Sequence, residues 1–206
     1  MKEDSQDKKK KGVIQENVEA ILFALVLALL IRAFIIQAYK IPSGSMEDTL
    51  LVGDHLLVSK FIYGVRMPFT NKTIIPFSKP KRGDIVVFKA PVKPPKDFIK
   101  RVIGLPGDKI EVRNKNLYIN GKRYKNEPYI KHTDKNMYPA RDDFGPVIVP
   151  ENSYFMMGDN RDNSTDSRFI GFIPYSMLRG KALLVYWSWK GDSFGVRWSR
   201  IGHLLK

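Results

Sequence analysis

The sequence contains no cysteine, and this absence removes several kinds of chemistry at once. Disulfide bonds, thiolate nucleophiles, and zinc or iron–sulfur sites built on sulfur are all excluded. Histidine is scarce as well, and the spacing of His55, His132 and His203 is not that of metal ligands. We therefore expect no metal and no cofactor, and a folded domain that is held together by packing alone.

Acidic residues are too few to balance the basic ones, and the formal net charge is +14. Residues 1–19 hold five lysines and five acidic residues, so the surplus lies downstream. A basic chain can bind nucleic acid or a lipid surface, or simply present a solvated basic face. No lysine-rich helix or aromatic RNA-binding pattern is present, which favours the solvated face over nucleic acid; lipid headgroups would satisfy the charge equally well.

The longest apolar run, from Ala20 to Ile36, predicts one membrane span. Its length of ~17 residues gives ~25 Å as a helix, and Arg32 near its far end can reach the interface. Tyr39 and Lys40 form an interfacial anchor, and the lysines of residues 8–11 place the N-terminus in the cytoplasm. We predict a cytoplasmic tail at 1–17, a span at 18–38 and an extracytoplasmic domain at 39–206.

Two alternatives for this run are less favoured. A cleaved signal peptide also has basic residues ahead of an apolar run, but this run is longer than a usual signal-peptide core and no small-x-small cleavage site follows. A buried core helix is disfavoured because no polar face alternates with the apolar one.

Beyond Pro42 the pattern changes to short runs of β-branched and aromatic residues bounded by Gly, Pro and Asp, which predicts strands. Asn120–Gly121 favours a hairpin with a type I′ turn, and residues 114–116 mark a second turn. The polar residues 125–146 predict a surface excursion. Short strands with frequent turns predict a mainly β fold built on a curved antiparallel sheet.

Two serines, Ser43 and Ser45, flank a glycine just after the apolar run and are candidates for a nucleophile. A serine hydroxyl needs a base, and His55 is one option, although an ordinary strand residue is the simpler interpretation of this histidine. A lysine is the other option, because Ser-Lys pairs follow the same logic. Only ~0.04% of a free lysine is neutral at pH 7, and burial raises this fraction by lowering the pKa.

Lys100 is the lysine best placed for such a role, since apolar residues surround it. In an extended strand it shares a face with Phe98 and Val102, where it either acts as a base or extends its amine to solvent. Spacing leaves these two alternatives open. Lys89 is a rival, but the Ala-Pro that follows it indicates the end of a strand.

The densest polar stretch is MGDNRDNSTDSRFIGFIP, residues 157–174. Its alternating oxygen ligands fit a calcium loop, but two arginines lie inside it, and the glycine and terminal glutamate of an EF-hand are missing. A structural loop with Asp–Arg ion pairs and a loop that supports a catalytic group both remain open.

Three stretches that follow the apolar run in order resemble the sequence boxes of bacterial type I signal peptidases (leader peptidases, peptidase family S26). They are IPSGSMEDTLLVGD, KRGDIVVFKAP with DFIKRVIGLPGD, and MGDNRDNSTDSRFIGFIP, so the likeness extends from Pro42 to about Pro174. Self-cleaving repressors of the LexA type share the Ser-Lys chemistry, but they would need a DNA-binding helical domain in place of the membrane helix. The resemblance implies a signal peptidase/LexA-like fold, a coiled antiparallel sheet with a hairpin extension.

The resemblance also implies catalytic roles for the matching residues. Ser45 would be the nucleophile and Lys100 its general base. The hydroxyl of Ser43 would join the backbone N–H of Ser45 in an oxyanion hole. The reaction would remove signal peptides from exported preproteins by cleaving after small residues at the −1 and −3 positions.

Supporting roles follow from the same resemblance. Ser164 matches a hydroxyl that orients the base, Asp166 and Arg168 match a structural ion pair, and Asp159 lies in the same loop. Apolar residues beside the catalytic pair would form the walls of shallow substrate pockets; the candidates are Ile41, Pro42, Leu50, Phe98 and Ile99.

The implied protein is a monomer that crosses the bacterial plasma membrane once. Its partners would be preprotein signal peptides and the lipid bilayer, without nucleic acid. Gram-negative relatives carry two spans, whereas one is convincing here. A competing hypothesis is a membrane-tethered domain without enzymatic activity that binds anionic lipid or polymer through its basic surface.

Overall fold

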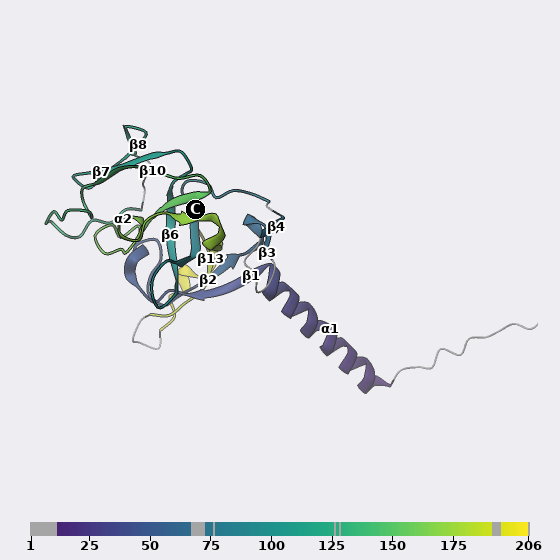
Figure 1. Ribbon diagram of the computed structural model, residues 1–206. Coiled ribbons are helices and arrows are strands. Elements are labelled where there is room, and N and C mark those ends of the chain that lie inside the picture. The colour runs from purple at the N-terminus through teal and green to yellow at the C-terminus, as the bar shows by residue number, and fades with distance from the viewer. Residues whose placement is uncertain are drawn as a thin grey trace, which may run out of the picture.

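The computed structural model describes residues 12–66, 73–75, 77–125, 127, 129–190 and 195–205. One long helix, α1 (Val13–Phe34), projects from a β-rich body (Figure 1). The other elements, in chain order, are β1 (Ile36–Lys40), the 3-10 turn η1 (Gly44–Met46), β2 (Asp54–Ser59), η2 (Phe61–Tyr63), β3 (Val65–Arg66), β4 (Thr73–Ile75), β5 (Ile85–Ala90), β6 (Lys96–Gly104), β7 (Lys109–Arg113), β8 (Asn116–Ile119), β9 (Lys122–Arg123), β10 (Phe144–Ile148), β11 (Ser153–Met157), α2 (Ser167–Ile170), β12 (Ile173–Pro174), η3 (Tyr175–Met177), β13 (Leu178–Ser188), η4 (Trp198–Arg200) and β14 (His203–Leu204).

The apolar run forms α1, and its segment Ile14–Arg32 is long and apolar enough to cross a membrane. None of that segment is buried against the rest of the protein. The helix begins earlier and ends earlier than the predicted span of residues 18–38. Residues 36–38 lie in β1 instead, because β1 pairs with β2 in antiparallel register from Ile36–Ser59 to Lys40–His55. Sheet hydrogen bonds thus replace helical ones at this point.

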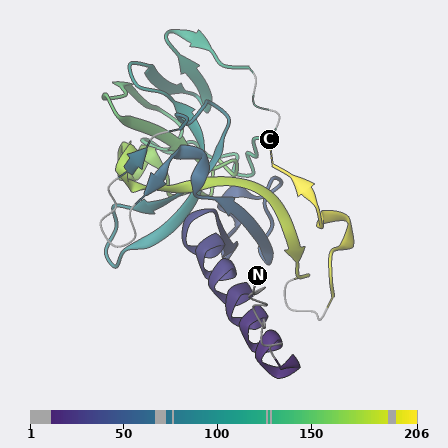
Figure 2. The ribbon, with the colours of Figure 1, turned by 90° about the vertical axis from the view of Figure 1, so that its right-hand side faces the viewer.

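An antiparallel sheet of eight strands forms most of the body, in the order β1-β2-β13-β5-β6-β11-β12, with β14 paired to β13. The long strand β13 lies between β2 and β5, and Figure 2 shows it curving across the body. Its pairing with β2 shifts register at two places, and such irregularities increase twist and bend a sheet. The predicted mainly β fold with an N-terminal apolar helix is confirmed.

A second sheet contains four strands in the order β10-β7-β8-β9. Two tight turns join β7 to β8 and β8 to β9. Asn114 and Lys115 have φ of 47° and 64°, and Asn120 and Gly121 have φ of 53° and 78°. Positive φ at both central residues is the mark of a type I′ turn, so the turn predicted at Asn120–Gly121 is confirmed.

The segment between β1 and β2 is anchored in the hydrophobic core. Ile41, Met46 and Leu50 are buried in one cluster with side chains from β2, β5 and β13. Burial of three apolar side chains over ten residues fixes the path of the intervening chain, since each contributes roughly 1.5–3 kcal/mol. The backbone of Gly44 and Ser45 is therefore held at a defined place beside β6.

Candidate active site

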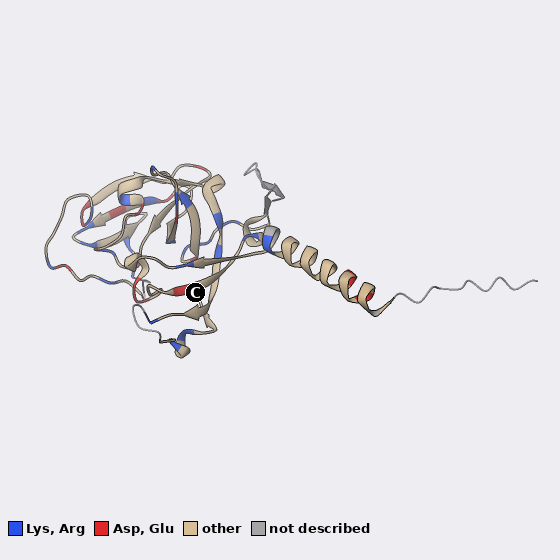
Figure 3. Cartoon of the chain, turned by 90° about the horizontal axis from the view of Figure 1, so that it is seen from below, with Lys and Arg blue, Asp and Glu red and all other residues tan. Residues whose placement is uncertain are grey.

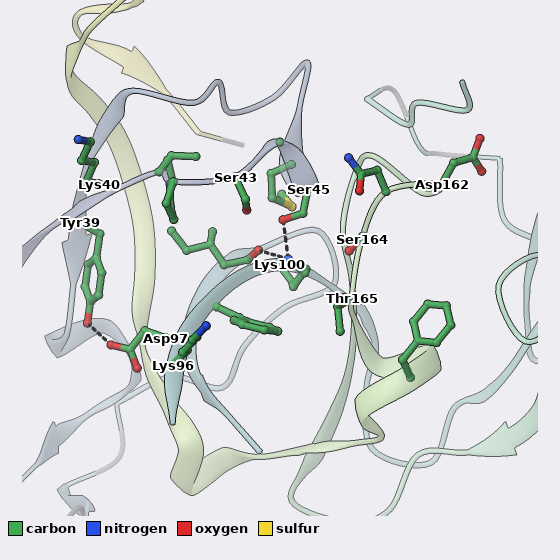
Figure 4. A pocket seen from close by; sticks show the side chains of 18 of the residues that line it. Tyr39, Lys40, Ser43, Ser45, Lys96, Asp97, Lys100, Asp162, Ser164 and Thr165 are labelled. Atoms are coloured by element: carbon green, nitrogen blue, oxygen red, sulfur yellow. Dashed lines mark hydrogen bonds between the residues drawn. The ribbon is translucent and has the colours of Figure 1, made fainter. Parts of the chain in front are cut away.

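A cavity with polar and apolar walls lies between the segment after β1, strand β6 and the loop before α2 (Figure 4). Its volume is about 650 Å³. At one end the Tyr39 hydroxyl donates to Asp97 at 3.4 Å. At the other end lie residues 162–165 and Phe169. Residues from all three stretches that resemble the family's sequence boxes line this cavity, although the stretches are far apart in the chain.

Ser45 lies in the middle of η1, and two contacts hold its backbone in place. Its carbonyl accepts a hydrogen bond from the backbone N–H of Asn160 at 3.2 Å. The side-chain amide of Asn160 donates to the carbonyl of Gly44 at 3.1 Å. Met46 is buried directly behind the serine, so the hydroxyl of Ser45 points to the cavity while its neighbour points to the core.

Lys100 reaches Ser45 across the cavity floor. Its Nζ donates to Oγ of Ser45 at 2.7 Å and to the carbonyl of Ile99 at 3.1 Å. The residue is only 4% exposed, and its Nζ lies 5.3 Å from the centre of the Phe98 ring. Of the two alternatives that spacing left open, the amine takes the buried one and does not extend to solvent.

Burial lowers the pKa of Lys100 from its ordinary value of 10.5 to about 8. The cause is the loss of water around the charged form, and the negative charges of Asp166 and Asp159 oppose it in part. A lysine with this pKa is neutral in about one molecule in ten at pH 7. A neutral amine within hydrogen-bonding distance of a hydroxyl is the arrangement that a serine nucleophile with a lysine base requires.

The rival bases lie elsewhere. Lys89 is exposed on β5, and among the described residues it is not part of the cavity wall. His55 lies in β2, where it is paired with Lys40 and contacts the ring of Tyr186 at 5.9 Å. Neither residue lines the cavity that Ser45 faces.

Two further serines, Ser43 and Ser164, lie in the cavity wall near Ser45 and Lys100. Figure 4 shows Ser43 and Ser164 on either side of the Lys100 amine. Ser43 is exposed to the cavity next to Ser45. Ser164 is 8% exposed, and its hydroxyl has no hydrogen-bond partner among the described residues. Ser164 therefore makes no hydrogen bond to Lys100 here, although its hydroxyl lies in the wall of the same cavity, and its role in orienting the base stays a prediction.

Two buried ion pairs support the loop behind the cavity. Arg168 donates to Asp166 from Nε at 2.9 Å and from Nη2 at 2.8 Å. Arg101, on the opposite side of β6 from Lys100, donates to both carboxylate oxygens of Asp159 at 2.8 and 2.6 Å. Asp159 also accepts from the hydroxyl of Thr49 at 2.6 Å, which connects the loop to the segment that carries Ser45.

Gly158 is a site residue that the sequence interpretation missed. A Cβ at this position would overlap the side chain of Ser164 and the carbonyl oxygen of Ser45. Only glycine lets these two parts of the chain approach so closely. The sole sequence signal was its place at the start of the polar stretch, which does not by itself distinguish close packing from a turn.

The excursion at 125–146 was also missed as a part of the site. Lys131 pairs through its backbone with the loop, donating to the carbonyl of Asp159 at 2.8 Å and accepting from Arg161 at 3.0 Å. Its Nζ lies 3.4 Å from Glu47 and 3.2 Å from Asp48, just after Ser45. The excursion therefore bridges the loop and the serine segment. No local pattern predicts these contacts, because they join residues far apart in the chain.

The predicted substrate-pocket residues divide into two groups. Ile41, Pro42, Phe98 and Ile99 all line the cavity beside Ser45 and Lys100. Leu50 does not: it is fully buried in the core cluster that anchors the serine segment. An apolar residue close to the motif in sequence thus faces the core because the chain turns inward after η1.

Comparison with known proteins places this geometry in context. The family model described as "Signal peptidase, peptidase S26" matches residues 14–187. A signal peptidase I from Pseudomonas aeruginosa is 35% identical over 228 residues, which cover 94% of this chain and 80% of the relative. Signal peptidase I P from Bacillus subtilis subsp. natto is 42% identical over 167 residues, covering 79% of this chain and 83% of the relative. A crystal structure of a signal peptidase I from Enterococcus faecalis V583 is 36% identical and covers 50% of this chain and 97% of its own, with a TM-score of 0.43.

Proposed function

This chain belongs to the signal peptidase family, peptidase S26, whose members are peptidases that remove signal peptides, and we propose that it acts through a Ser45–Lys100 dyad. The observation that carries the proposal is the distance of 2.7 Å between Nζ of Lys100 and Oγ of Ser45, at a buried position in a cavity. Burial supplies the neutral amine, and the hydrogen bond supplies the path for the proton.

The reaction begins when Oγ of Ser45 attacks the carbonyl carbon of the scissile peptide bond, while neutral Lys100 accepts the hydroxyl proton. The lysine then gives this proton to the departing amine, and the C–N bond breaks. A water molecule attacks the resulting ester and transfers a proton to Lys100. The ester bond to Ser45 breaks, the serine recovers its proton, and the signal peptide leaves as a carboxylate.

The negative charge that develops on the carbonyl oxygen requires donors. The backbone N–H of Ser45 and the hydroxyl of Ser43 are our candidates, since the first belongs to the attacking residue and the second lines the same cavity. One donor of this kind contributes roughly 3 kcal/mol to lowering the barrier. The Ser164 hydroxyl, buried in the same wall, is our candidate for orienting Lys100 when substrate fills the cavity.

The shape of the cavity favours substrates with small side chains at the −1 and −3 positions. Ile41, Pro42, Phe98 and Ile99 form apolar walls on both sides of the catalytic pair. The core packs behind Ile41, which is itself buried, so these walls cannot move back to admit a large side chain. The preferred substrates are the signal peptides of exported preproteins.

The apolar helix α1 anchors the protein in the membrane, with the N-terminus in the cytoplasm and the β domain outside. The described part of α1 carries acidic Glu16 and Glu19 at the far end and Arg32 at the end next to the body (Figure 3). Orientation therefore depends on the lysines of residues 8–11. Strand β1 connects the helix directly to the cavity over five residues, or ~17 Å, which brings the catalytic pair close to the outer surface of the bilayer.

The experiment that tests the dyad replaces each member and measures the cleavage of a preprotein by the purified protein. We expect Ser45→Ala and Lys100→Met each to lose at least about 10³-fold in kcat/KM, as removal of a nucleophile or its base does. Ser199→Ala and Lys89→Met are matched controls, because both side chains are exposed and lie outside the cavity wall. Normal cleavage by Ser45→Ala would favour the competing hypothesis of a tethered binding domain.

A further inference from the structure

A groove lies where α1 meets the sheet, and it shares no lining residue with the catalytic cavity. Its volume is about 920 Å³. One wall is the last part of α1, with Ala28, Leu29 and Ile31. The other wall is formed by β1 and β2, with Ile36 and Leu57 among its apolar residues. The groove thus continues the apolar surface of the helix onto the edge of the β domain.

Basic side chains gather at the junction of these two walls. Arg32 and Lys60 both line the groove, and Nζ of Lys60 donates to the backbone carbonyl of Arg32 at 3.3 Å. The positive charge of Arg179 also acts on Lys60. Nε of Arg179 lies 3.6 Å from a carboxylate oxygen of Asp97. The pKa of Lys60 is lowered, first by burial and then by the charges of Arg179 and Arg32. Cations that repel one another in this way are stabilised by an anion between them.

The depth of the groove relative to a bilayer follows from the length of the helix. Ile14–Arg32 contains 19 residues, so this part of the helix is ~28 Å long. This length is close to the ~30 Å thickness of the hydrocarbon core of a bilayer. Arg32 then lies at the level of the lipid headgroups. Ala28 and Leu29 lie one turn deeper, at the level of the acyl chains, while Lys60 lies on the side of the β domain. The apolar and basic parts of the groove match the two parts of a phospholipid.

We propose that this groove is a binding site for one anionic phospholipid, whose phosphate lies between Arg32 and Lys60 and whose acyl chain packs against α1. The inference rests on the proposed membrane anchoring of α1. A zwitterionic lipid fits less well, because its own cationic group would have to lie beside the same basic residues. A lipid held here ties the helix to β1, the strand that leads to Ser45, and so fixes the height of the cavity above the bilayer.

The test measures lipid retention by the full chain in detergent micelles. Phosphatidylglycerol and phosphatidylcholine with the same acyl chains are added in equal amounts, and the lipid bound per protein is determined by native mass spectrometry. We expect the wild type to retain one phosphatidylglycerol in preference to phosphatidylcholine. Arg32→Gln/Lys60→Gln should weaken its retention about 20- to 30-fold, because each basic residue at a membrane surface contributes about fivefold.

Matched variants separate the loss of this site from the loss of charge or of folding. Lys109→Gln/Lys122→Gln removes the same charge from exposed positions on the four-stranded sheet, remote from α1 (Figure 1), and should retain phosphatidylglycerol fully. Arg32→Lys/Lys60→Arg keeps the charge and should bind within about threefold of the wild type. Glycerol 3-phosphate, which has the headgroup chemistry without acyl chains, should not displace the lipid.

Three results would overturn the proposal: equal retention of both lipids by the wild type, undiminished retention by Arg32→Gln/Lys60→Gln, or displacement by glycerol 3-phosphate at the lipid's own concentration. Flotation with vesicles of phosphatidylcholine alone tests the anchor separately. A chain that fails to float would refute the anchoring of α1, whereas a chain that floats but shows no lipid preference in micelles would refute the groove alone.

Discussion

At the scale of single residues, the proposed chemistry depends on the pKa of Lys100, which burial lowers and acidic neighbours raise. Burial alone would favour the neutral amine strongly, and Asp166 and Asp159 restore part of the preference for the charged form. Both acids are themselves held by arginines, Arg168 and Arg101, which limits this effect. The outcome is a base whose pKa of about 8 lies near the pH at which the protein would work.

The pH dependence of cleavage is the prediction at this scale. In the proposed dyad, protonated Lys100 cannot accept the proton of Ser45, so cleavage requires the neutral amine, which becomes populated as the pH rises. We expect kcat/KM to increase about tenfold per pH unit below an apparent pKa of about 8, and to level off above it. The measurement is a profile of initial rates from pH 6 to 10. A rate that is constant over this range would argue against lysine as the base.

At the scale of elements, the loop from Gly158 to Arg168 acts as a support that reaches two sides of the site. It contacts the serine segment through Asn160 and Asp159, and it carries Ser164 into the cavity wall. The excursion at 125–146 joins the same loop through Lys131. Specific contacts therefore hold three segments with little regular structure, and close packing sets their mutual position more than strand pairing does.

Gly158→Ala is the prediction that tests this support. The added Cβ would push against the carbonyl of Ser45 and the side chain of Ser164, so both must shift. A displacement of ~1 Å in a reacting group can cost about 100-fold in rate, and we expect a fall in kcat of that order with little change in KM. Circular dichroism during heating should show that the sheet still folds. Full activity in a folded Gly158→Ala protein would contradict the role assigned to this close approach.

At the scale of the whole molecule, the helix and the catalytic domain are joined without a flexible linker. Only Ile35 separates α1 from β1, and β1 is paired along its length with β2. If α1 anchors the protein as proposed, the position of the cavity relative to the bilayer is set by this direct connection to the sheet. A substrate that is also inserted in the membrane meets the enzyme in one plane, which raises its effective concentration.

Removal of residues 1–34 tests this coupling, because it deletes α1 and leaves β1 complete. We expect the shortened protein to cleave a soluble peptide with the kcat/KM of the full chain. Cleavage of a preprotein inserted in vesicles should fall about 100-fold, since the advantage of confinement is lost. The ratio of the two rates is the measurement, and an unchanged ratio would mean that α1 has no part in presenting the substrate.

Local sequence patterns determined much of this protein. The apolar run dictated α1, and β-branched runs bounded by Gly, Pro and Asp dictated the strands. The Asn120–Gly121 pair dictated its turn, because positive φ is acceptable there. The lack of cysteine left packing as the means of holding the domain together. The order of the three motifs was enough to identify the family, since each motif is a short stretch whose residues are neighbours in sequence.

Only the tertiary structure decided how residues distant in the chain meet. Spacing left two alternatives for Lys100, a base or an amine that extends to solvent. The residue became buried because β5 pairs with β6 and the core closes over both. The same packing of the sheet and core brings Lys100 to Ser45. It also leaves no room for a side chain at Gly158 and turns Leu50 toward the core. Local conformational preference acts over a few residues, whereas these contacts exist only once the eight-stranded sheet is complete.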